Sequence, residues 1–427
     1  MFWAIDTLRQ SAFSREAADN LAGRPWAQAF SETGRGELIR IFHYITDTLV
    51  PGLVASSSEK GGRLDGIASF LPSPRGWELG CRLGDALIYR YIHDEGRYPE
   101  AVAIVLWEEA DCRSQGQSVA EFIYLMGIRP LWDDTAGRVR GLEPIPLKEL
   151  KRPRIDVTGC ISSRFRSGMG PVIALLNRAV RLAGELEEDD ADNFVARHTM
   201  ADVKWLRAQG IQEQEAFAQA VARVFPEPPA SGEICHLPGL LQRAIPKFDA
   251  VIKNEDTRAT HMFCSEVYNA CQGSLVAAGA RMTGKPPRAY IGDSSDPDRI
   301  QVREVREEAR RLFWGEAMNP HFLADMRAYG SAGAYELVHY LERACQWDIS
   351  CGILEDWMYE MFARRYVLNK DIHQWMSDVA PGALHLAARS LLQAIGQGRW
   401  RARKRRAGEL ERLEAEMPSG EEEACRA

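Results

Sequence analysis

The chain has 427 residues, of which 45% are hydrophobic and 26% are charged, a composition typical of a folded protein with two or three domains. The formal net charge is −7, from 53 Lys and Arg against 60 Asp and Glu residues, and this argues against general nucleic-acid binding, which needs a basic excess. No stretch of about eighteen consecutive apolar residues occurs, so we expect no membrane-spanning helix.

Cysteine usage and the first residues bear on the cellular compartment. The nine cysteines are scattered and form no CxxC pair, which indicates free thiols in a reducing compartment. Charged Asp6, Arg9 and Arg15 fall where a signal peptide needs an apolar stretch. The sequence therefore predicts a cytoplasmic protein.

The chain changes character near residue 76. Residues 1–75 carry short helical patterns and a Ser/Gly-rich connector, which predict an irregular amino-terminal segment. Strand and helix patterns then alternate. The expected elements are a helix near 79–91, a strand at 101–107, a helix at 119–126, a strand at 154–158, a helix at 171–186, a strand at 247–253, a helix at 264–279 and a strand at 287–293.

Strands that alternate with helices predict the α/β class, with parallel-sheet units and crossover helices. Acidic residues 185–193 suggest a boundary between two such units, at 76–190 and 191–300. Residues 301–400 are expected to form a mainly helical carboxyl-terminal region, because apolar residues recur there at helical spacing. Residues 401–427 read as a charged tail, helical at first.

The common signatures of chemistry are missing: the sequence has no P-loop, GxGxxG, HExxH or GxSxG motif. Cys264 and Cys271 would lie on one face of the expected helix, about 10 Å apart along its axis. That separation is too large for both thiolates to bind one zinc ion at about 2.3 Å, so we expect buried apolar cysteines instead.

Two loops follow predicted strands, where ligands of parallel sheets bind. Asp293, Ser294 and the residues after them could line a cleft, or they could cap the next element. Glu108, Glu109 and Asp111 could act as acid, base or metal ligand, although a solvated acidic loop is the simpler interpretation. From the residues alone, the function stays open.

A series of segments nevertheless appears in an order that resembles one family. Among them are "MGIRPLWD", "NFVARH", "FDAVIKNEDTR", "RAYIGDSSDPDR" and "WDISCGILEDWMYEMFARRYVL". Between Gly76 and Trp400 the chain resembles the carboxyl-terminal part of the cobaltochelatase large subunit and of the related magnesium chelatase H subunit. The "EDWMYE" and "RYVL" segments are closer to the cobalt enzyme.

The resemblance implies binding of a tetrapyrrole ring and insertion of a divalent metal, with AAA+ partner subunits that hydrolyse ATP. Cobalt or magnesium would be a substrate, and no tightly bound cofactor is expected. For the cobalt enzyme the ring is hydrogenobyrinic acid a,c-diamide, in cobalamin biosynthesis; for the magnesium enzyme it is a porphyrin. Insertion needs a base for two pyrrole protons, and carboxylates and His are the expected groups.

Several positions depart from the family. The family's His-Gly-Gly is represented by Gln272, Gly273 and Ser274, and glutamine does not titrate near neutral pH or bind metal well. Gln115 and Gln117 replace loop carboxylates, and the family loop after Phe225 is shortened. The large amino-terminal part of the family is missing here, so we expect that a separate amino-terminal half could be a partner.

Two functions stay open on these grounds: a working metal-insertion subunit, or an inactive homologue that carries a tetrapyrrole or docks on the AAA+ partners. The candidate catalytic positions are Glu108, Glu109, Asp111 and Gln272, the last at the position of the family His. The candidate tetrapyrrole-binding residues are Asp293, Ser294, Tyr268 and His198. No metal ligand can be assigned.

Overall fold

The computed structural model describes residues 71–133, 137–226, 238–258 and 260–416. The chain separates into two compact units, Met1–Ala68 and Ser69–Ala427, and the fold below is that of the second. The predicted irregular segment at 1–75 lies almost entirely outside the described residues, as does the end of the predicted tail.

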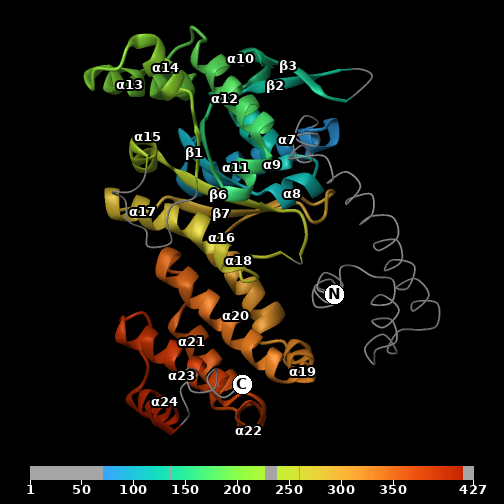
Figure 1. The fold of residues 1–427 in the computed structure, drawn as a ribbon, viewed down its shortest axis with the longest axis vertical. Helices are drawn as coiled ribbons and strands as arrows, with labels where there is room; N and C mark the ends of the chain where they lie inside the picture. The colour runs from blue at the N-terminus through green and yellow to red at the C-terminus, as the bar shows by residue number, and fades with distance from the viewer. Residues whose placement is uncertain (1–70, 134–136, 227–237, 259, 417–427) are drawn as a thin grey trace, which may run out of the picture. The chain divides into compact units, whose positions relative to one another are not determined.

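A six-stranded sheet, in the order β5-β4-β1-β6-β7-β8, forms the centre of the first half of this unit (Figure 1). Its strands are β1 (Ala101–Leu106), β4 (Asp156–Ile161), β5 (Val224–Pro226), β6 (Ala250–Glu255), β7 (Arg288–Asp293) and β8 (Gln301–Glu304). The first five are parallel, so their carboxyl ends lie along one edge, which we call the carboxyl edge. We call the opposite edge the amino edge.

Strand β1 is the central strand, and all six of its residues are buried. It pairs with β4 on one side and β6 on the other, with Ile104 opposite both Gly159 and Ile252. Burial on both faces is why its sequence is continuously apolar rather than alternating. The predicted α/β class with a parallel sheet is confirmed.

Helices cover both faces of the sheet. The bounds of those that alternate with the strands are α7 (Pro74–Glu95), α8 (Glu108–Arg113), α9 (Gln117–Leu125), α10 (Leu147–Leu150), α11 (Ser163–Gly168), α12 (Gly170–Gly184), α13 (Phe194–Ala208), α14 (Glu213–Ala220), α15 (Gly239–Ala244) and η3 (Ile245–Lys247). Helices α7 and α9 pack together and contact the strands. The other face contributes Ala103, Val251 and Ile291 to a hydrophobic core that continues into the carboxyl-terminal helices.

Two features of the sheet were not predicted. Strand β8 is antiparallel to β7, so the sheet is mixed at that edge. Strands β2 (Ile128–Trp132) and β3 (Val139–Pro144) form a separate antiparallel hairpin. The β8 segment is short and only one of its residues is buried, so it carries little of the apolar patterning by which strands are recognised.

The predicted helix at 264–279 is interrupted. It consists of α16 (Glu266–Tyr268), a π-helical turn η4 (Asn269–Gly273) and α17 (Ser274–Thr283). Cys264 precedes the helix, so it does not share a helical face with Cys271 as the sequence suggested. The wide turn directs Gln272 toward the sheet, as described below.

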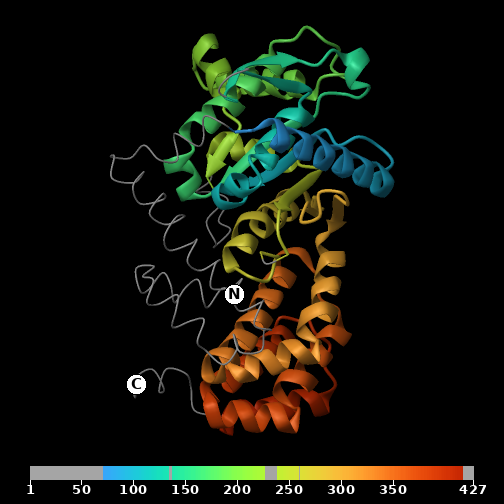
Figure 2. The ribbon, with the colours of Figure 1, turned by 90° about the vertical axis from the view of Figure 1, so that its right-hand side faces the viewer.

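The predicted helical region is confirmed beyond β8. Its elements are α18 (Val305–Leu312), η5 (Phe313–Ala317), α19 (Pro320–Ala328), α20 (Gly330–Cys351), α21 (Asp356–Phe362), η6 (Ala363–Val367), α22 (Lys370–Val379), α23 (Pro381–Gly396) and α24 (Lys404–Glu416). Figure 2 shows these helices, in orange and red, layered beyond the yellow strands. Long α20 joins the two parts, because Trp347 donates a hydrogen bond to the Met262 carbonyl and Arg343 to the Phe263 carbonyl.

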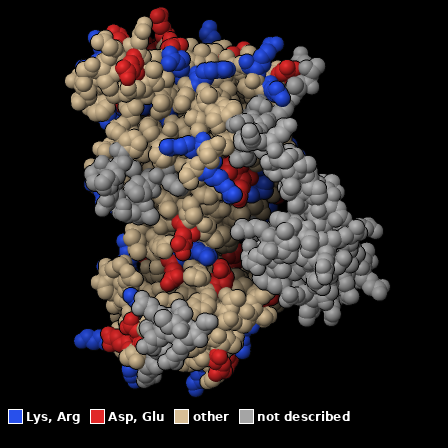
Figure 3. Space-filling view, in the orientation of Figure 1, with Lys and Arg blue, Asp and Glu red and all other residues tan. Residues whose placement is uncertain are grey.

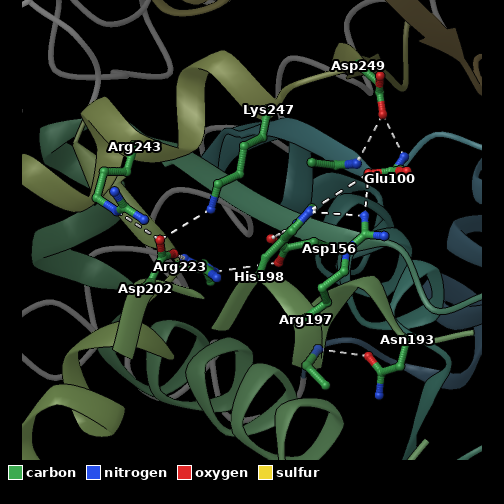
Figure 4. A network of polar contacts seen from close by, with 12 residues as sticks. Glu100, Asp156, Asn193, Arg197, His198, Asp202, Arg223, Arg243, Lys247 and Asp249 are labelled. Atoms are coloured by element: carbon green, nitrogen blue, oxygen red, sulfur yellow. Dashed lines mark hydrogen bonds and ion pairs between the residues drawn. The ribbon is translucent and has the colours of Figure 1, made fainter. Parts of the chain in front are cut away.

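Buried ion pairs fix the amino edge. Asp202 of α13 is fully buried and accepts hydrogen bonds from Arg223 Nη1 at 2.7 Å, Arg243 Nε at 3.1 Å and Lys247 Nζ at 3.2 Å (Figure 4). Arg223 precedes β5, while Arg243 and Lys247 belong to α15 and η3. One carboxylate therefore holds three separate segments, and the nearby cations keep the pKa of Asp202 below its usual range despite burial.

Replacing Asp202 with alanine leaves buried Arg223 without its closest acceptor. We expect the free energy of unfolding, measured by urea denaturation, to fall by about 3 kcal/mol, as for other broken buried ion pairs. Asp190→Ala, at an exposed position, is the matched control and should change it by less than about 0.5 kcal/mol. Equal small losses in both variants would contradict the role assigned to Asp202.

Candidate functional site

The carboxyl edge brings together most of the residues that the sequence singled out. Glu108 and Glu109 follow β1, Asp293 and Ser294 lie at the end of β7, and Tyr268 contacts the ring of Trp107. Trp107 and Tyr268 meet edge to face, with ring centres 5.7 Å apart. This edge is the candidate functional site.

Glu108 is a buried carboxylate at the end of the central strand, with 4% of its surface exposed. It accepts a hydrogen bond of 2.9 Å from Ser162 Oγ, which follows β4. Arg164 lies 3.8 Å from Glu108 and bonds exposed Glu109 at 3.1 Å. The carboxylate of Glu108 is therefore held in one orientation by a neutral donor, with a cation nearby.

Asp111 is not at the open edge, as the sequence interpretation assumed, but beneath it. It is fully buried, and its Oδ1 accepts the Ser118 backbone N–H at 3.0 Å, which caps the start of α9. Its Oδ2 has no hydrogen-bond partner among the described residues. Burial raises the pKa of Asp111 to about 7, although the hydrogen bonds that its carboxylate accepts from backbone N–H groups act in the opposite direction.

Glu121 is a second buried acid that the sequence analysis missed. It lies on α9 and accepts a hydrogen bond from the Asn254 amide of β6. Burial raises the pKa of Glu121 to about 8, and the charge of Asp111 adds to that shift. Glycine at 292 makes room for this arrangement, because a Cβ there would lie 2.1 Å from Asn254 Oδ1.

Lys253 is another residue that sequence reasoning passed over. Although it belongs to β6, its Nζ lies over the Tyr268 ring, 3.8 Å from the centre, and 3.5 Å from Glu255 Oε1. Burial raises the pKa of Glu255 to about 7, against the effect of Lys253. The available signal was a lysine within a predicted buried strand, because buried lysines need a specific partner.

Arginines pair with acids elsewhere along the same edge. Arg113 of α8 donates two hydrogen bonds, of 2.9 and 2.8 Å, to Asp256 after β6. Arg303 of β8 bonds Asp293 at 2.6 Å, so Asp293 is already occupied by a cation. Ser294 Oγ donates to Gln117 at 2.7 Å. The acids of this edge therefore alternate with cations rather than forming an acidic surface.

Gln272 is fully buried and does not face the carboxyl edge. Its amide donates to the backbone carbonyls of Tyr290, at 2.8 Å, and Val251, at 3.2 Å. Both acceptors lie inside strands β7 and β6. In this geometry Gln272 ties the π-helical turn to the sheet.

His198 lies at the other end of the sheet. Its Nδ1 is 3.0 Å from Asp156, the first residue of β4, and its Nε2 is 4.0 Å from Glu100, which precedes β1 (Figure 4). A ring placed over the carboxyl edge would therefore not contact His198. The "NFVARH" segment instead has a structural role. Asn193 caps α13, because its side-chain oxygen accepts a hydrogen bond from the Ala196 N–H.

Surface cavities occur on other elements. One of about 280 Å³ is lined by residues of α20, α21 and α23, and another of about 470 Å³ by residues of α12, α13 and α14. We place the candidate site at the carboxyl edge because the oriented carboxylate, the cations and the aromatic pair converge there, whereas the walls of these cavities carry no buried acid.

Two further properties concern the described residues as a whole. Among the described residues, no group of three or more His, Cys, Asp or Glu side chains could hold a metal ion. None of the helices in the described part of the chain is both long and apolar enough to cross a membrane. On the face shown in Figure 3, acidic and basic side chains are interspersed.

The buried acids predict how stability depends on pH. Folding raises the pKa of Glu121 from 4.5 to about 8, so between these values the folded chain holds a proton that the unfolded chain has lost. Stability therefore falls as pH rises through this window, by about 1.4 kcal/mol per pH unit for each proton held. Glu121→Gln should reduce the slope of unfolding free energy against pH between pH 5.5 and 7.5 by about 1.4 kcal/mol per pH unit, whereas exposed Glu187→Gln should leave the slope unchanged. Parallel profiles in both variants would show that Glu121 is ionised when folded.

Comparisons with known proteins identify the family of the chain. Residues 68–233 and 230–407 match the sequence model of the family described as CobN/Magnesium Chelatase. The aerobic cobaltochelatase subunit CobN of Sinorhizobium is 29% identical over 78% of this chain, and the chloroplastic magnesium-chelatase subunit ChlH of Oryza sativa subsp. indica is 27% identical over 78%.

The same match holds in three dimensions. The catalytic subunit of cobaltochelatase from Mycobacterium tuberculosis superposes with a TM-score of 0.76 and 28% identity, over 97% of this chain and 39% of that one. The chain spans 29% of the length of the Sinorhizobium relative and 26% of the rice relative. With most of its length matched by the family model, the chain belongs to the CobN/Magnesium Chelatase family.

Proposed function

We propose that this chain binds a tetrapyrrole at the carboxyl edge of its sheet and takes part in inserting a divalent metal, cobalt in the first instance, into that ring. The observation that carries the proposal is Glu108, a buried carboxylate at the end of the central strand, oriented by Ser162 and flanked by Arg164. Membership of the family and the similarity to a cobaltochelatase catalytic subunit support it.

Metal insertion exchanges two pyrrole N–H protons for one M²⁺ ion, so the site must accept protons while the ring is held. In the proposal Glu108 is the proton acceptor, because its carboxylate is oriented and shielded from bulk water. Exposed Glu109 would pass the proton to solvent. The Trp107 and Tyr268 pair would contact the face of the ring.

The metal is a substrate in this scheme, and the ring nitrogens are its final ligands. We propose that AAA+ partner subunits use ATP to drive the insertion and that the reaction belongs to cobalamin biosynthesis, as the resemblance to the cobalt branch implies. Whether on the same polypeptide or another, the remainder of the family's large subunit is part of the proposed assembly, since this chain spans less than a third of the relatives.

A second candidate is a homologue that holds the ring without inserting metal. The hydrogen bonds of Gln272 favour it, because this residue, at the position of the family His, is turned toward two strand carbonyls and leaves the ring edge without that imidazole. This carrier would bind the same ring at the same edge and dock on the same partners. The two candidates therefore predict the same ring binding and differ only in whether metal is inserted.

Absorbance titration with hydrogenobyrinic acid a,c-diamide, and separately with a water-soluble porphyrin, tests the binding. Insertion of Co²⁺ in the presence of the remainder of the large subunit, the AAA+ partners and ATP tests the reaction. We expect Glu108→Gln to keep ring affinity within about twofold, since glutamine can still accept from Ser162, and to slow insertion by about 100-fold. Exposed Glu187→Gln should change neither. Ring binding by the unmodified chain without any insertion would select the carrier, and the absence of saturable binding would contradict both candidates.

A further inference from the structure

We infer that Arg164 is the receptor for a carboxylate arm of the ring, and that it exchanges its bond to Glu109 for a bond to that arm. This inference rests on the proposed function. It identifies the side chain that positions the substrate and couples ring binding to the release of an acid at the site.

The position of Arg164 suits this role. It lies in the first turn of α11, directly after β4, and 69% of its side chain is exposed. Its guanidinium makes one hydrogen bond of 3.1 Å to Glu109, which is itself 59% exposed, and approaches Glu108 only to 3.8 Å. Exposed single-contact ion pairs of this kind contribute little stability, so the exchange costs little.

Three other cations of the carboxyl edge are held more firmly. Arg113 makes two hydrogen bonds to Asp256, whose side chain is mostly buried. Arg303 bridges Asp293 and fully buried Glu308. Lys253 is itself buried, between Glu255 and the Tyr268 ring. Moving Arg113 or Lys253 would leave a buried acid without its cation, and moving Arg303 would break its bonds to both Asp293 and Glu308, which is costly.

The carboxylate arms of the ligand match the N–H donors of Arg164 that do not bond Glu109. Biosynthetic tetrapyrroles carry carboxylate arms around a flat macrocycle, and a guanidinium binds a carboxylate through two parallel hydrogen bonds. An arm that takes both bonds replaces the single bond to Glu109. Glu109 is then released from Arg164, and its carboxylate can accept a hydrogen bond from another donor at the site.

A double-mutant cycle tests the exchange, with two probes: a porphyrin that carries four propionate arms and the same ring with neutral hydroxyethylamide arms. We expect Arg164→Ala to weaken binding of the propionate ring about tenfold and to leave the neutral ring unchanged. Arg164→Lys should recover part of the loss, because it keeps the charge and loses the paired donors. Arg166→Ala, an exposed arginine two residues away on the same helix, is the matched control and should bind like the unmodified chain.

Glu109→Gln removes the competitor for Arg164, so it should tighten binding of the propionate ring severalfold. In the Arg164→Ala background the same change should have no effect, since there is then no guanidinium to compete for. If the unmodified chain binds the propionate ring but Arg164→Ala behaves like Arg166→Ala, or if Glu109→Gln acts equally in both backgrounds, the exchange is wrong while the proposed function stands. If neither ring binds, both are overturned.

Discussion

The fold depends on the burial of β1 between two parallel neighbours and two helical layers. Because every side chain of this strand is inside, its register with β4 and β6 is fixed, and a slip of one residue would place each side chain on the wrong face. The first polar residues that can follow such a strand appear where it leaves the sheet. Glu108, the first residue of α8, is thereby positioned by the packing of the strand that precedes it.

The two edges of the sheet use charge differently. At the amino edge, buried Asp202 draws Arg223, Arg243 and Lys247 together, and these ion pairs hold separate segments in place. At the carboxyl edge, several acids are also paired with cations, but the pairs range from buried to mostly exposed. The buried ion pairs of the amino edge keep the fold fixed, whereas the exposed pair at the carboxyl edge can exchange partners. This difference suits a protein whose fold stays unchanged while a charged ring binds.

Much of this could be predicted from the sequence, for identifiable reasons. Continuous apolar runs revealed β1, and the loops after strands pointed to Glu108, Glu109 and Asp293, because parallel strands end at a common edge. The depth of a side chain could not be predicted: Asp111 reads as a loop acid but caps α9 from inside. The sequence also does not show which residues far apart in the chain form ion pairs. The cations beside Glu108, Glu109 and Asp293 were therefore not predicted. His198 was grouped with the ring site on the resemblance alone, because the sequence does not show against which end of the sheet α13 packs.

The central claim, that the ring binds at the carboxyl edge, is tested most directly by hydrogen–deuterium exchange of the chain with and without a saturating propionate-bearing porphyrin. The account predicts slower exchange in the segments around residues 107–113, 162–168 and 265–269, which border that edge, and no change around 197–202 at the amino edge. Protection centred on 197–202, or confined to the carboxyl-terminal helices, would contradict the account.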